Sequence, residues 1–82
     1  MYKENFAKRI KKARYDTGYT QQQVADLTGI SRANIAKYET GRIEPNLETL
    51  AILAQFYNVS TNWLLGISIE QDIKIQDSIK KR

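Results

Sequence analysis

The side chains able to carry out chemistry in this 82-residue chain first exclude several kinds of site. The sequence has no cysteine and no histidine, which removes thiolate or histidine metal sites, disulfides and Ser-His or Cys-His catalytic pairs. Carboxylates are scattered over the expected helix ends and surface, with no pair for acid–base work: Asp16, Asp26, Glu44 and Glu48. We therefore expect no enzyme, no metal and no cofactor.

Binding chemistry is concentrated near the middle of the chain. One side of a helix expected there carries two alanines and two cations, while Ile35 and Tyr38 fall on the other side. A B-DNA major groove, about 12 Å wide, accepts one helix; arginine can pair with guanine, and an alanine methyl can meet a thymine methyl. The predicted base contacts are Arg32, Ala33, Ala36 and Lys37. Arg32 and Lys37 also fit a simpler interpretation as solvated surface charges.

Phosphate groups would be held by residues on either side of that helix. Gln21 begins an earlier helix, where free N–H groups and the positive end of the helix dipole attract anions, although it is also an ordinary first-turn residue. Thr40 and Arg42 follow the central helix. Asn34 could bind a phosphate or support the Ser31 cap. The predicted phosphate contacts are Gln21, Asn34, Thr40 and Arg42.

Helical spacing of apolar residues and repeated capping signals predict five short helices that position these groups. The expected spans are 5–17, 20–28, 31–40, 47–57 and a short helix from 60 to the glycine at 66. Between the second and third lies a corner, Gly29-Ile30-Ser31, whose isoleucine we expect in the core, fixing the angle of the flanking helices. The apolar face of the fourth helix is expected to comprise Leu47, Leu50, Ala51, Ala54 and Tyr57.

The sequence thus predicts an all-α fold, a compact five-helix bundle containing a helix-turn-helix. Residues 1–66 form the binding domain. Residues 67–82 form a C-terminal extension whose isoleucines fit either a helix or a strand, and which could contribute to dimerisation. The first 42 residues carry nine Lys and Arg against four Asp and Glu, so the basic charge lies with the first half.

Several of these residues together resemble a known family. Gln21, Ala25, Gly29, Ile35 and Tyr38, followed by YETGRIEP and NVSTNWLLG, are similar to the pattern of the XRE family, the helix-turn-helix proteins of phage repressor and Cro type. The resemblance covers about residues 6–66 and implies the phage repressor type of bundle. One departure is Thr28, where an aliphatic residue is common, and we expect Leu27 to fill that volume.

The resemblance also implies structural roles. Arg14 and Glu39 occupy the places of a structural ion pair. The family's dimer contact falls in the region from Val59 to Gly66. The expected dimer residues are Val59, Trp63, Leu64 and Leu65.

Taken with the resemblance, the sequence predicts a regulator that binds double-stranded DNA sequence-specifically. One short helix reads few base pairs, so we expect a homodimer, acting as a repressor on a two-fold symmetric operator. The alternative is a protein-interaction module such as an antitoxin. No apolar run approaches the roughly 20 residues that span a bilayer, so we expect a cytoplasmic protein of a bacterium or phage, with no membrane partner.

Overall fold

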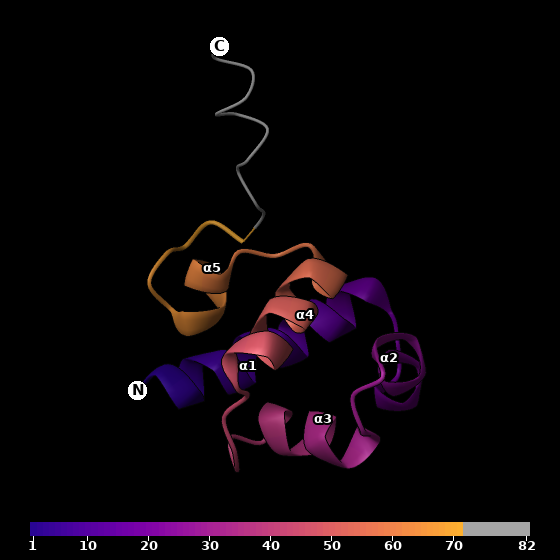
Figure 1. Ribbon diagram of the computed structural model, residues 1–82. Coiled ribbons are helices and arrows are strands. Elements are labelled where there is room, and N and C mark those ends of the chain that lie inside the picture. Colours follow the sequence, from indigo (N-terminus) through magenta and orange to yellow (C-terminus); the bar gives the residue numbers. More distant parts are fainter. Residues whose placement is uncertain (72–82) are drawn as a thin grey trace.

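The computed structural model describes residues 1–71 and folds them into five helices around one core (Figure 1). The helices are α1 (Tyr2–Thr17), α2 (Gln21–Thr28), α3 (Arg32–Glu39), α4 (Leu47–Tyr57) and α5 (Thr61–Leu65). The predicted all-α fold is therefore confirmed.

The core is assembled from every helix. Its largest fully buried side chains are Phe6 of α1, Val24 of α2, Leu53 of α4 and Leu64 of α5. Burying a side chain of this size contributes about 1.5–3 kcal/mol. The third helix joins them through Tyr38, whose ring meets that of Phe6 edge-on at 6.2 Å. Only the buried side of α3 is fixed in this way, so its opposite side faces solvent.

The corner between α2 and α3 turns on a glycine and a cap. Gly29 adopts φ +80°, which favours glycine, and its N–H donates to the carbonyl of Ala25 at 2.9 Å. Ser31 then caps α3, its Oγ accepting from the backbone N–H of Asn34 at 3.1 Å. Ile30 is half-buried and packs against the core, as the sequence predicted. The corner is thus tied at both helix ends.

Thr28 has a different role from the one expected. Leu27 does not fill space beside it, because the Leu27 side chain is 60% exposed. The Thr28 hydroxyl instead donates to the Val24 carbonyl at 2.7 Å and accepts from the Ile30 N–H at 3.2 Å. A hydroxyl therefore braces the corner where an aliphatic side chain was expected.

Two helices differ in detail from the sequence prediction. α1 begins at Tyr2 instead of residue 5, since Glu4 pairs with the terminal ammonium in its first turn. In α4 the buried stripe consists of Leu53, Ala54 and Tyr57, whereas Leu47 is 84% exposed and Ala51 is also exposed. The apolar run of α4 fits more than one stripe, and packing against α1 and α5 selects the one containing Leu53.

After α5 the chain turns back along the bundle. Residues 67–71 are neither helix nor strand, and the Ser60 N–H donates to the Gln71 carbonyl at 2.7 Å. The prediction of a helix or strand for 67–82 otherwise concerns residues 72–82, which lie outside the described residues. In Figure 1 this returning segment and α5 lie on the opposite side of the bundle from α3.

Candidate nucleic-acid interface

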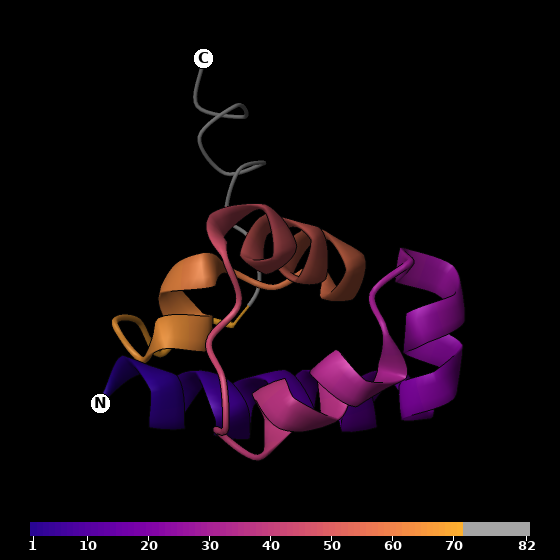
Figure 2. The ribbon, with the colours of Figure 1, turned by 60° about the horizontal axis from the view of Figure 1, so that its bottom comes forward.

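The predicted base-reading residues lie on the solvent-facing side of α3. Arg32, Ala33 and Lys37 are exposed and Ala36 is half-buried, while Ile35 faces the core. Figure 2, with the lower side of the molecule turned forward, shows α3 in front of α1 with nothing described in front of it. A short helix with two alanines on its open side can come close to a concave surface such as the major groove.

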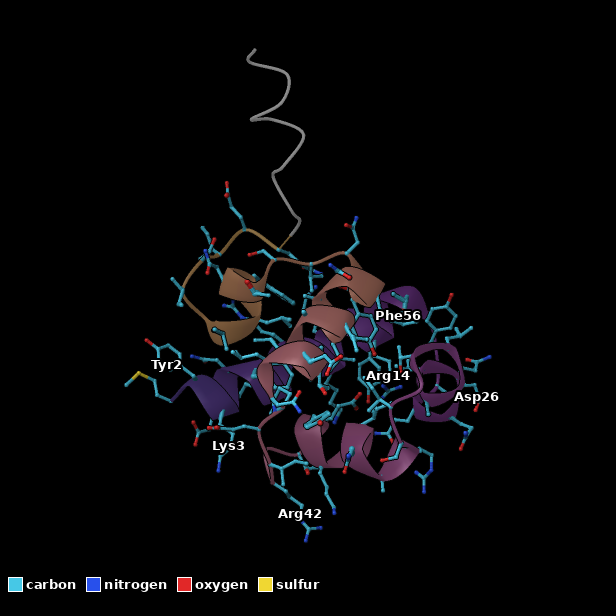
Figure 3. The ribbon with its side chains drawn as sticks, viewed as in Figure 1. Tyr2, Lys3, Arg14, Asp26, Arg42 and Phe56 are labelled. Atoms are coloured by element: carbon cyan, nitrogen blue, oxygen red, sulfur yellow. The ribbon has the colours of Figure 1, made fainter. Side chains whose placement is uncertain are left out.

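The cations around α3 make no ion pair with the part of the chain that the structure describes. Among residues 1–71, no carboxylate pairs with Arg32, Lys37 or Arg42. Arg42, just after α3, extends its side chain away from the bundle on the α3 side, and Lys3 of α1 points to the same side (Figure 3). Their positive charge is available to an outside partner.

Beneath this surface lies a buried ion pair between α1 and α3, to which α2 adds a hydrogen bond. Arg14 of α1 donates from Nε and Nη2 to the two oxygens of Glu39 of α3, at 2.7 and 2.9 Å. The two side chains are 11% and 3% exposed. Gln21 of α2 adds a third donor, its Nε2 lying 3.1 Å from Glu39 Oε1. The hydrogen bond to Glu39 raises the pKa of Arg14, so the guanidinium stays charged. This cluster fixes how α1, α2 and α3 meet.

The predicted phosphate contacts occupy varied settings. Gln21 is the first residue of α2, as expected, but its side-chain amide is bound to Glu39. The Asn34 side chain is exposed, and only its backbone N–H serves the Ser31 cap. The Thr40 hydroxyl donates back to the carbonyls of Ala36 and Lys37, at 3.1 and 3.2 Å. Arg42 and Asn34 therefore present side chains outward, whereas the Gln21 amide and the Thr40 hydroxyl already have internal partners.

Three of the four expected dimer residues are buried within the protomer. Val59, Trp63 and Leu64 are 3%, 5% and 0% exposed, because they pack into the bundle's own core. These three side chains are thus occupied by packing within the protomer, and their place in a dimer contact stays a prediction. Leu65 is half-buried and lines a pocket of about 200 Å³ with Tyr2 and Leu50. Leu47, one turn before Leu50 in α4, is an exposed apolar residue.

Sequence reasoning missed a second polar cluster, on the side of α1 that faces α5. Arg9 donates from Nη1 to the carbonyls of Trp63 and Ser68, at 2.8 and 2.9 Å, and its guanidinium lies 5.1 Å from the Trp63 ring centre. Lys12 bonds Asp16 at 2.7 Å and the Gln71 side chain at 3.1 Å. Both partners of Arg9 are backbone carbonyls more than 50 residues away, and Gln71 is as distant from Lys12, so no local sequence signal could identify these three contacts.

Comparisons with known proteins agree with this geometry. A family model described as helix-turn-helix matches residues 10–64. The chain is 48% identical over 60 residues to YonR, an HTH-type transcriptional regulator derived from the SPbeta prophage of Bacillus subtilis (strain 168); those residues are 73% of this chain and 56% of YonR. It is 42% identical over 62 residues to ImmR, another HTH-type transcriptional regulator of that organism, covering 76% and 49% respectively.

A more distant relative is named as a repressor. The chain is 29% identical over 77 residues, 94% of its length, to 67% of RstR, the cryptic phage CTXphi transcriptional repressor of Vibrio cholerae. The chain spans about half the length of YonR and ImmR, at 56% and 49%. Within residues 1–71, no helix combines the length and apolar character needed to cross a membrane.

Proposed function

Because the chain belongs to the XRE-type helix-turn-helix family, we propose that it binds double-stranded DNA and regulates transcription, with α3 lying in the major groove. One observation carries the proposal. The open side of α3 combines small residues with Arg32 and Lys37, cations that no carboxylate of residues 1–71 neutralises. Such a surface fits an anionic groove better than a protein partner, since protein interfaces favour aromatic anchors at their centre.

Base recognition is assigned to the exposed residues near the start of α3. Arg32 is the proposed bidentate contact to guanine and Ala33 the contact to a thymine methyl, with Lys37 and Ala36 further along. Backbone phosphates are assigned to Arg42 and Asn34 through their side chains, and to Gln21 through the N–H groups of the α2 start. Thr40 keeps a role only through its hydroxyl oxygen, since its proton is already donated.

The proposed assembly is a homodimer on a two-fold symmetric operator, with half-sites about 34–36 Å apart. Two apolar residues support a contact at this edge of the bundle: Leu65, which is half-buried and lines the pocket, and Leu47, which is exposed one turn before the pocket residue Leu50. The proposed action is repression, the mode that the name of RstR records for that relative.

Selection of bound duplexes from a random pool, followed by binding titrations, tests this function. We expect a consensus with two-fold symmetry, bound far more tightly than a scrambled duplex. Affinity should fall steeply between 50 and 200 mM salt, with a slope of about −0.9 for each phosphate contacted. Equal binding of single strands and duplexes, or selection without any consensus, would contradict the proposal. A reporter placed behind the selected site then separates repression from activation.

A further inference from the structure

The cations in the middle of α1 belong to two sets that face different neighbours. Arg9 and Lys12 face α5 and residues 67–71, where they bond Trp63, Ser68 and Gln71. Lys11 lies next to Lys12 in sequence but is not bonded to that segment. The charge on the α5 side is therefore engaged within the molecule.

Lys11 belongs to the edge of α1 that borders α3. Four residues before it, Ala7 faces the end of α3, where a Cβ placed on Gly41 would lie 3.7 Å from the Ala7 Cβ. Three residues after it, Arg14 binds Glu39 of α3. Residues spaced by three or four share one side of a helix, so Lys11 lies between these two contacts on the α3 side.

The described surroundings of Lys11 hold an aromatic ring and a second cation, but no carboxylate that pairs with its ammonium. Its ammonium lies 5.8 Å from the centre of the Tyr15 ring, and the Arg14 guanidinium lies 4.9 Å from the same centre. Tyr15 is 62% exposed, and no carboxylate of residues 1–71 pairs with Lys11. The exposed Tyr15 ring therefore holds the Lys11 ammonium in place through a cation–π contact. The neighbouring Arg14 is already paired with Glu39. This is a favourable place for an outside anion.

We propose that Lys11 binds a backbone phosphate of duplex DNA, on the strand that passes the start of α2; this inference rests on the proposed function. A helix in the major groove has a phosphate backbone on each side of it. The start of α2 would face the backbone on one of those sides. Hydrogen bonds among Arg14, Glu39 and Gln21 join the start of α2 to the α3 edge of α1. Lysine serves here as a point charge that carries no sequence information, with Tyr15 as its positioning residue.

The salt dependence of binding tests the proposal, because each phosphate contact adds about 0.9 to the slope of log affinity against log salt. For Lys11→Gln we expect a slope smaller by about 0.9 per protomer. Over 50 to 200 mM salt this makes the loss of affinity about 3.5-fold smaller per contact. Cognate and scrambled duplexes should weaken by the same factor. Lys11→Arg should restore the wild-type slope.

Lys12→Gln is the matched control, since it removes the same charge from the adjacent residue on the other side of α1. We expect it to retain the wild-type slope. If Lys11→Gln keeps the wild-type slope, or if both variants lower it equally, the phosphate site is overturned while the proposed function stands. Should the wild-type protein bind no duplex at all, the proposed function fails first and this site with it. Thermal melting of both variants checks that the fold is intact.

Discussion

The α3 side and the α5 side of the bundle both carry cations, but the chain treats them differently. On the α5 side, Arg9 and Lys12 are bonded to carbonyls, to Asp16 and to residues of the returning segment. On the α3 side, Arg32 and Lys37 have no carboxylate partner among the described residues. Counting basic residues would not separate these two surfaces. Internal bonding does, because a cation already engaged by its own chain has less charge to offer a ligand.

Burial also differs between the two sides. The Arg14–Glu39 pair under α3 has side chains 11% and 3% exposed, whereas Lys12 and Asp16 are 55% and 49% exposed. Removing one partner of a buried pair leaves an uncompensated charge, while an exposed pair contributes little. The α3 side should therefore depend on its ion pair for stability far more than the α5 side does.

The largest effect is expected for Arg14→Met, which leaves Glu39 buried with Gln21 as its remaining side-chain donor. The free energy of unfolding should fall by about 3–5 kcal/mol. Arg9→Met, which removes two bonds to carbonyls on the α5 side, should cost only about 1–2 kcal/mol. Urea denaturation of the two variants measures the difference. Equal losses of unfolding free energy would show that the buried pair stabilises the fold no more than the two bonds from Arg9 to the Trp63 and Ser68 carbonyls do.

Two glycines, one on each side of the bundle, allow the same comparison of stability to be made at the backbone. Gly29 in the α2–α3 corner and Gly66 after α5 have φ of +80° and +83°. Alanine should strain both by about 1–2 kcal/mol. At Gly66 the added Cβ would also meet the Asn5 side chain, which donates to the Leu65 carbonyl, whereas Gly29 has open space around it. Gly66→Ala should thus be the worse by about 1 kcal/mol. Thermal melts giving the reverse order would contradict the close approach at Gly66.

Arg32→Ala addresses binding alone. Arg32 is exposed and pairs with no carboxylate of residues 1–71, so stability should be unchanged while specific binding weakens by about 1–3 kcal/mol. Affinity for a scrambled duplex should hardly move. Titrations on both duplexes provide the measurement. A parallel loss on the two would make Arg32 a phosphate contact and not a reader of guanine.

The smallest effect is expected when the pH is lowered, which weakens the exposed contact between Asp16 and Gln71 on the α5 side. Hydrogen bonds from Lys12 and from Gln71 lower the pKa of Asp16 below its ordinary 3.8. The hydrogen bond from the Gln71 side chain to the Asp16 carboxylate is therefore present above pH 3.8. It is lost only as the pH falls through the lowered pKa of Asp16. An NMR titration of the Gln71 side-chain amide should show a midpoint below 3.8. A midpoint at or above that value would mean that Asp16 is not held as described.

Local signals predicted much of this molecule. Capping signals such as Ser31 and the glycine after α2 predicted where helices begin and end, because such signals act within one turn. The pairing of Arg14 with Glu39 followed from family resemblance. Local patterns were weaker where several residues suit one role: α4 offered two apolar stripes, and packing chose the one with Leu53.

Long-range contacts were beyond prediction from one sequence. Val59, Trp63 and Leu64 were expected at a dimer contact, yet their apolar character equally suits the protomer's own core, where they lie. Arg9 bonds to backbone carbonyls, which every residue has, so no pattern of side chains in the sequence indicates these contacts. Knowing which cations the chain itself engages required the folded structure.

Amide chemical shifts recorded while a selected duplex is added show which side of the bundle meets DNA, since they report on the α3 side and the α5 side at once. We expect large changes over the start of α2, over α3 and at Lys11, with little change at Arg9, Lys12 and residues 67–71. Changes centred on the α5 side, with α3 unaffected, would contradict this expectation.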